Sequence, residues 1–228
     1  MERRLPREYS GWQEHEPAFR RMTTPELVQE IQDGSPERRL AALSVIDLAD
    51  VAQSTIEDWI RTLPDAEANE LAGAIPAQRP HSACAEDVRW VGVARLGYEQ
   101  RRLPTFLVML FSSLEALDSR ACAEAAGEWE RIGDWLGDVY DRVVAAGEED
   151  ARGDISLFVF ENYLNQPAIF EAFCGMMVRH EVLALEVSAN PALYLLQVDE
   201  AHQRFALQEA AANGGIPFDQ AWKTLQGG

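Results

Sequence analysis

Residues 24–46, TPELVQEIQDGSPERRLAALSVI, contain two helix-sized segments separated by a short turn. Pro25 and Pro36 each stand near the start of a segment, where a helix tolerates proline best. Gly34 can close the first segment in a left-handed conformation. The apolar residues recur at intervals of mostly three or four: Leu27, Val28, Ile31, Leu40, Leu43 and Ile46. This spacing gives each segment one apolar side, and it predicts a pair of packed helices.

Similar punctuation continues along the chain. Ser54 and Glu57 have the spacing of a capping box, which predicts the start of a further helix. Residues 128–147, EWERIGDWLGDVYDRVVAAG, form the clearest helical segment of the second half. Its apolar stripe consists of Trp129, Ile132, Leu136, Val139 and Val143. Residues 88–102 and 155–164 fit either a helix or a strand. We therefore predict an all-α fold, or nearly so: a multi-helix array or bundle with at most minor strand content.

The segment from residue 24 to residue 76 resembles a HEAT-type helical repeat. It has a short first helix, a turn of Asp-Gly-Ser-Pro type, and a second helix in which arginines alternate with small residues that let helices pack closely. The chain shows no second copy at the period of roughly 40 to 47 residues that such a repeat has. The resemblance implies a binding scaffold, and it supplies no catalytic residues.

The sequence predicts four parts: a basic-leaning arm at 1–22, a helical segment at 23–76, a linker at 77–84 and a second helical segment at 85–228. Two prolines in PAQRPHSAC, residues 76–84, mark the linker. We expect the two helical segments to pack together as one domain.

Composition predicts a folded, soluble and cytoplasmic protein. Of the 228 residues, 47% are hydrophobic, which is enough for a substantial core. The longest apolar run, FLVMLF at 106–111, is far shorter than the roughly 20 residues that a bilayer-spanning helix needs. The N-terminal residues lack the apolar run of a signal peptide. Three cysteines at wide spacing favour reduced thiols over a disulfide framework.

The formal net charge of −18 is the strongest global signal. Nucleic acids are dense lines of negative charge, so they would be repelled over most of this protein's surface. Only the first 21 residues lean the other way, with five arginines and four glutamates. The charge therefore favours a basic protein as the partner, and it argues against direct binding of nucleic acid.

The acidic residues cluster between residues 128 and 150, on the side of the predicted helix away from its apolar stripe and just beyond its end. Like charges four residues apart, such as Asp134 and Asp138, destabilise an isolated helix. A sequence that retains them is a candidate for binding cations. Trp135 lies off the main stripe and is a candidate to flank the interface. The candidate partner-binding residues are Glu130, Asp134, Trp135, Asp138, Asp141, Glu148, Glu149 and Asp150.

Asp199-Glu200-Ala201-His202 matches the four letters of a helicase DEAH box. Such a box works with a phosphate-binding G-x-x-x-x-G-K-[ST] loop, and this chain has one lysine, Lys223, without the required glycines. We instead predict a single helix from Asn190 to Phe205, capped by Asn190. Its apolar stripe would be Leu195, Val198, His202 and Phe205, with Glu200 and Arg204 as a surface pair.

The sequence contains no complete linear motif for a metal, a cofactor or a nucleophile. His180 begins an H-E-x-x-H zinc motif, but Ala184 stands where the second histidine is needed. His81 and Cys84 have ligand spacing without further partners. The Glu-x-x-His of di-iron bundles and the G-x-S-x-G of hydrolases do not occur. We expect no metal, no cofactor and no catalytic residue.

Three functional hypotheses follow. Small, strongly acidic proteins without catalytic motifs resemble bacterial immunity proteins and antitoxins, which bind basic toxins, and phage inhibitors that mimic the charge of DNA. The leading hypothesis is therefore an acidic protein-binding module of the inhibitor, immunity or antitoxin type. The second is a small helical enzyme that uses His180 or His202 with a carboxylate as acid and base. The third is a structural adaptor in a larger complex that docks through residues 1–21.

Overall fold

The computed structural model describes residues 9, 11–75, 84–115, 117, 123–162, 167–196 and 198–227. Over these residues the chain is all-α, with no strand, and the predicted fold class is confirmed. The chain divides into two compact units, Met1–Leu117 (unit 1) and Asp118–Gly228 (unit 2). The linker predicted at 77–84 lies outside the described residues except for Cys84. None of the helices formed by the described residues has both the length and the apolar character needed to cross a bilayer.

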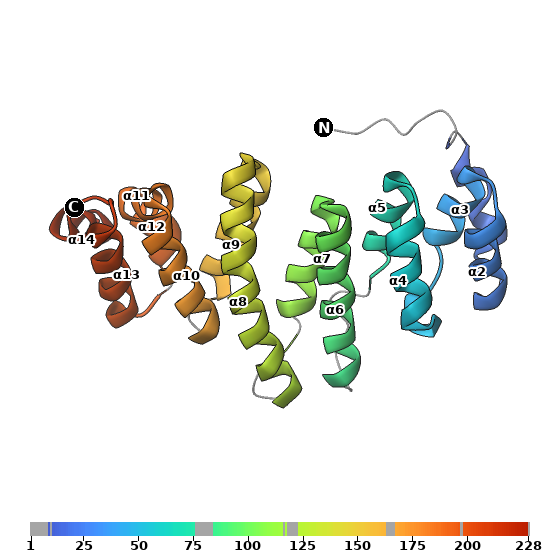
Figure 1. Cartoon of the computed structure of the whole chain (residues 1–228), viewed down its shortest axis with the longest axis horizontal. Coiled ribbons are helices and arrows are strands. Elements are labelled where there is room, and N and C mark those ends of the chain that lie inside the picture. Colours follow the sequence, from blue (N-terminus) through green and yellow to red (C-terminus); the bar gives the residue numbers. More distant parts are fainter. Residues whose placement is uncertain are drawn as a thin grey trace. The chain divides into compact units, whose positions relative to one another are not determined.

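Unit 1 begins with short elements and continues as a series of longer helices. Its elements are η2 (Trp12–Glu14), α1 (Glu16–Phe19), α2 (Thr24–Asp33), α3 (Pro36–Leu43), η3 (Leu48–Asp50), α4 (Gln53–Thr62), α5 (Asp65–Gly73), α6 (Cys84–Arg101) and α7 (Pro104–Glu115). The helices pack as the pairs α2/α3, α4/α5 and α6/α7, and α3, α4 and α5 also pack against the next helix but one (Figure 1). Stacked pairs of this kind are the arrangement of helical-repeat proteins.

The spacing of these pairs differs from that of the HEAT repeat that residues 24–76 resemble. The first helices of the pairs begin at Thr24, Gln53 and Cys84, which are 29 and 31 residues apart. A HEAT repeat spans roughly 40 to 47 residues. The sequence therefore shows no second copy at the HEAT period, although the helices do pair and stack.

The turn between α2 and α3 differs from the predicted one. The carboxylate of Glu26 accepts hydrogen bonds from the backbone N–H and the hydroxyl of Thr23, both at 2.7 Å, which fixes the start of α2. Gly34 ends the helix with φ −71° and ψ 165°, so the predicted left-handed conformation is wrong. Glycine is required there by space, because an added Cβ would lie 2.4 Å from the carbonyl oxygen of Glu30.

Two further local predictions are resolved by contacts. Helix α4 begins at Gln53, so the capping box predicted at Ser54 is wrong. The carboxylate of Glu57 accepts instead from the side-chain carboxamide of Gln53 at 2.8 Å. Residues 88–102, which fit a helix or a strand, belong to α6 as far as Arg101. Gly97 provides room on this helix for Phe106, because an added Cβ would lie 2.2 Å from the ring.

Over the described residues, unit 2 contains the long helix α8 and, after it, six shorter helices. Its helices are α8 (Ala123–Ala146), α9 (Glu149–Asn162), α10 (Pro167–Arg179), α11 (Glu181–Ala189), α12 (Pro191–Leu195), α13 (Glu200–Ala212) and α14 (Phe218–Leu225). The apolar stripe predicted on α8 is confirmed, since all five of its side chains are buried: Trp129, Ile132, Leu136, Val139 and Val143. Residues 155–164 are helical as far as the end of α9 at Asn162.

Helices α8 and α10 approach closely through glycines on α8. A Cβ added at Gly133 would lie 2.7 Å from the carbonyl oxygen of Ala168, and one added at Gly137 would lie 2.9 Å from the guanidinium of Arg179. The backbones therefore pack against each other, and the side chain of Arg179 crosses α8 over Gly137. This close approach positions the charged residues of the candidate site.

The single helix predicted from Asn190 to Phe205 is wrong. Pro191 does begin a helix, but α12 ends at Leu195 and a new helix, α13, begins at Glu200. The carboxylate of Asp199 accepts from the first backbone N–H groups of α13, which favours a second start. This break changes the direction of the apolar side, and Phe205 is 45% exposed instead of buried.

Candidate partner-binding surface

Three of the candidate residues form an unpaired row on α8, named here the acidic row. Glu130, Asp134 and Asp138 are spaced four residues apart, so they follow one side of the helix, and all three are exposed. None of them forms a salt bridge with a residue that the structure describes. Trp135 is half-buried beside the row. The carboxylates of the row thus face solvent and are open to a partner.

Asp141 has a different environment. It accepts hydrogen bonds from Nε of Arg179 at 2.9 Å and lies 2.7 Å from Nε2 of His180. Burial would raise the pKa of Asp141, but the bonds from His180 and Arg179 outweigh it and hold this pKa below its usual value. Asp141 therefore joins α8 to the end of α10, and it is the candidate residue least free to meet a partner.

The three remaining acidic candidates lie at the turn from α8 to α9. Gly147 makes this turn with φ 69°, and Glu148, Glu149 and Asp150 are all exposed. Glu149 accepts from the guanidinium of Arg152 at 2.7 Å. The structure thus separates the eight candidates into an exposed row, a half-buried tryptophan, an ion-paired aspartate and an acidic turn.

A pocket of about 410 Å³ lies beside this turn, named here the unit 2 pocket. It lies where α8, α9, the end of α10 and the start of α11 meet. Its walls are formed by Tyr140, Val143, Val144, Gly147, Glu148, Glu149, Arg152, Arg179, His180, Glu181 and Val182. Of these, Glu148 and Glu149 were candidates for partner binding and His180 was a candidate acid or base of the enzyme hypothesis. Residues 179–182 join the wall through tertiary packing.

Two polar groups in the pocket wall have incomplete hydrogen bonding. Tyr140 is buried, and its hydroxyl lies near Ser156 and Arg152. It forms no hydrogen bond of good geometry with a residue that the structure describes. Burial raises the pKa of this hydroxyl. Arg152 donates to Glu149 and, at 3.2 Å, to Glu186, while its Nε has no partner among the described residues.

Exposed apolar side chains continue the surface next to this pocket. Val178, near the end of α10, and Val182 and Leu185, on α11, are each at least half exposed. Exposed apolar groups beside charged ones are typical of protein interfaces. Their exposure could not be predicted from the sequence, since all three fall in apolar stretches that predict burial.

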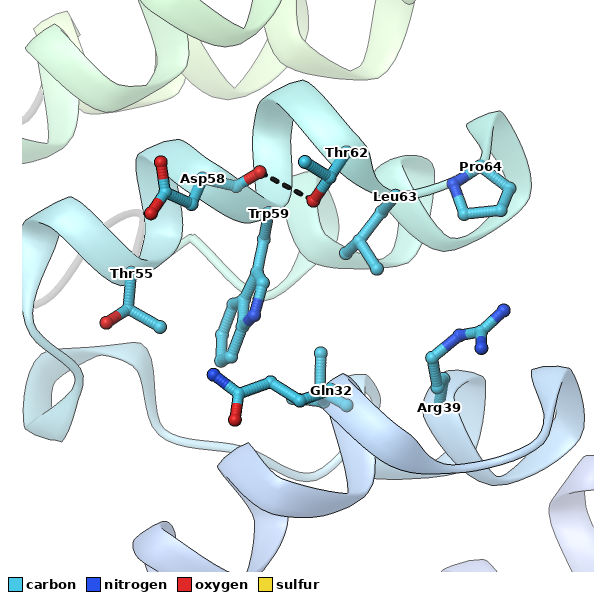
Figure 2. Close-up of a pocket in the computed structure, with 9 residues that line it drawn as sticks. Gln32, Arg39, Thr55, Asp58, Trp59, Thr62, Leu63 and Pro64 are labelled. Carbon is cyan, nitrogen blue, oxygen red and sulfur yellow. Dashed lines mark hydrogen bonds between the residues drawn. The ribbon is translucent and has the colours of Figure 1, made fainter.

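Unit 1 has a pocket of its own, of about 550 Å³, between α2, α3 and α4 (Figure 2). Figure 2 shows the indole of Trp59 and the carboxamide of Gln32 approaching each other across it, with Arg39 on the same side as Gln32. Trp59 is buried, and its face forms part of the wall. The charged groups of this wall are already engaged: Asp58 with Arg61 at 3.0 Å, and Arg39 with a buried glutamate.

That glutamate, Glu67 on α5, is fully buried. Arg39 donates to both of its oxygens, at 2.7 and 2.9 Å, and the hydroxyl of Tyr9 donates to it at 3.1 Å. The bonds to Glu67 raise the pKa of Arg39. Three separate parts of unit 1 thus meet at one carboxylate, which gives the pair a structural role and explains why Arg39 is not free for a ligand.

Among the residues that the structure describes, no three His, Cys, Asp or Glu side chains lie close enough together to hold a metal ion. His202 lies 2.5 Å from Asp199 at the start of α13, and the Glu200–Arg204 pair predicted on the surface is present at 2.8 Å. Asp199 therefore caps a helix instead of following a strand as in a DEAH box. His81 lies outside the described residues.

Comparison of the chain with protein-family models, with curated proteins and with solved structures found no match.

Proposed function

We propose that the chain is a protein-binding module that holds a basic partner protein against unit 2. The observation that carries this proposal is the acidic row on α8. Glu130, Asp134 and Asp138 repel one another along the helix and have no salt bridge to a described residue. A cationic partner would relieve this repulsion.

The surroundings of the row support the same function. Carboxylates of the turn at 148–150 extend the acidic surface, and charge of one sign speeds encounter with a partner of the other sign. The exposed Val178, Val182 and Leu185 provide apolar area that slows dissociation. We place the protein among inhibitors of the bacterial immunity or antitoxin type, whose partner is a toxin or another nucleic-acid-binding protein, in the cytoplasm.

Affinity capture with a charge-matched control tests the proposal. The full chain, the variant Asp134→Lys/Asp138→Lys and the control Asp33→Lys/Asp50→Lys are immobilised, and extract of the native cell is applied at low salt and eluted with a salt gradient. The control changes the net charge equally at exposed positions of unit 1. We expect one basic protein to be retained by the wild type and the control and lost by the row variant. Equal loss from both variants would reject the row as the binding site.

A second candidate function is an acid–base enzyme in unit 2, and the 2.7 Å contact of Asp141 with His180 at the pocket wall favours it. A carboxylate on one ring nitrogen orients an imidazole so that the other nitrogen can accept a proton. Cys174 is unsuited to nucleophilic attack, because burial raises its pKa to about 12. Native mass spectrometry separates the two functions: a bound small molecule that is lost in His180→Gln supports the enzyme.

A further inference from the structure

We infer that the unit 2 pocket receives the side chain of an arginine or a lysine from the basic partner. This inference rests on the proposed function and identifies the partner residue that would anchor the complex. The volume of the unit 2 pocket, about 410 Å³, lies within the range of ligand pockets. The pocket adjoins the acidic turn at 148–150, so a residue bound in it would be continuous with the proposed interface.

The charge of the pocket favours a cation. Its wall and the residues paired to that wall include five carboxylates and two guanidinium groups, a net charge of −3 with His180 neutral. These groups are Glu148, Glu149, Glu181, Asp141 and Glu186, with Arg152 and Arg179. Because Arg152 and Arg179 already form ion pairs with Glu149, Glu186 and Asp141, the carboxylates left over are those of Glu148 and Glu181.

The apolar part of the wall fits the stem of a long basic side chain. Val143 is buried, Val144 is half-buried and Val182 is 56% exposed, so apolar groups run from the floor of the pocket to its rim. Lysine and arginine place their methylene groups along such surfaces while the charged head reaches a polar partner. Val178 and Leu185 would contact the residues that flank the anchor.

The buried hydroxyl of Tyr140 is the observation that points to a ligand independently of the carboxylates. Tyr140 is 1% exposed, and its oxygen, which lies near Ser156 and Arg152, forms no hydrogen bond of good geometry with a described residue. Its ring is held edge-on against His180, with 5.2 Å between ring centroids. A phenol oxygen accepts readily from an ammonium or guanidinium N–H. The free Nε of Arg152 would favour an anion instead, but the net charge of −3 opposes an anion.

The experiment uses the full chain with labelled valine methyl groups and two small probes, N-acetyl-arginine amide and N-acetyl-citrulline amide. Citrulline has nearly the same shape as arginine without its charge. We expect the arginine probe to shift the NMR signals of Val144 and Val182 in a saturable way and the citrulline probe to leave them unchanged. Equal shifts with both probes, or none with either, would overturn the inference, and this comparison needs no variant that might misfold.

Variants with a matched control locate the binding. Tyr140→Phe should weaken the arginine probe roughly tenfold, since it removes one hydrogen bond to a charged group. Glu148→Gln/Glu181→Gln should abolish the shifts, whereas Asp134→Asn/Asp138→Asn, with the same change of net charge, should retain them. Equal loss in both double variants would overturn the pocket assignment. Capture of the partner by Asp134→Lys/Asp138→Lys is a separate readout, so the pocket can fail while the proposed function stands.

Discussion

The two units are similar in size and carry different charge. Residues 1–117 contain 19 acidic and 13 basic residues, a net charge of −6, while residues 118–228 contain 19 acidic and 7 basic residues, a net charge of −12. Unit 1 therefore has a basic residue for most of its acidic ones. Unit 2 has a surplus of carboxylates, and the acidic row belongs to this surplus.

The two units also differ in how exposed the ion pairs between their helices are. In unit 1, Arg39 on α3 meets Glu67 on α5, and the glutamate is fully buried. In unit 2, Arg179 meets Asp141 between α10 and α8, and both side chains are about two-fifths exposed. The Arg39–Glu67 pair of unit 1 thus has a fully buried carboxylate, whereas the Arg179–Asp141 pair of unit 2 lies at the surface. This contrast teaches that total charge alone does not locate a binding surface; pairing and burial do.

The largest expected effect is on the buried pair of unit 1. Glu67→Ala removes the carboxylate to which Arg39 and Tyr9 donate, and loss of one member of a buried pair costs about 3–5 kcal/mol. Urea unfolding measures the change. Glu57→Ala, which removes a more exposed partner of Arg61, is the control and should cost less than about 1 kcal/mol. Similar losses in the two variants would remove the contrast between the units.

The next effect tests whether unit 2 depends on close helix packing. Gly133→Ala places a methyl group against the backbone of Ala168 and should cost about 1–3 kcal/mol. Gly153→Ala on α9 is the matched control, since an added Cβ meets nothing within 4 Å; it should stabilise by about 0.5–1 kcal/mol. Thermal unfolding of both variants decides the point, and a neutral Gly133→Ala would show that α8 and α10 can separate at little cost.

A smaller effect distinguishes structural from exposed carboxylates within unit 2. Asp199→Ala removes the cap of α13 and should lower stability by about 1 kcal/mol. Asp134→Asn, in the acidic row, should change it by less than about 0.5 kcal/mol. Urea midpoints of the two variants measure this difference. A large loss in Asp134→Asn would mean that the row has an internal partner.

The smallest effect is the pH dependence that Asp141 contributes. Its pKa is lowered in the folded state. Its contribution to stability is therefore fully present above the unfolded pKa of roughly 3.9 and is lost as the pH falls through the folded pKa. Since Asp141 is 39% exposed, the contribution should be below about 1 kcal/mol. Urea midpoints of the wild type and Asp141→Asn between pH 2.5 and 6 should differ most at the upper end and converge at the lower. Parallel curves would contradict this pairing.

Local sequence signals identified most of the helices and only part of the candidate surface. The stripe on α8 was predicted correctly because five residues at helical spacing needed only one buried face. The prediction at 190–205 failed because the carboxylate of Asp199 starts a new helix where the apolar spacing favours continuation. The sequence did not predict that residues 179–181 lie beside Glu148. They are about thirty residues away in the chain and reach the pocket through the packing of α8 and α10.

The all-α class and the excess of negative charge follow from the amino-acid sequence alone, because helical spacing and residue counts do not depend on which helices pack together. Which carboxylates are paired and which face solvent depends on the packing of the helices. Glu67 lies on a short helix and reads like other surface glutamates, yet it is buried against Arg39 and Tyr9. Asp141 belongs to the same acidic series as Asp138, but its carboxylate bonds with Arg179 and His180 at the end of α10. Pairing depends on which helices pack together, and that is fixed by contacts between residues far apart in the chain.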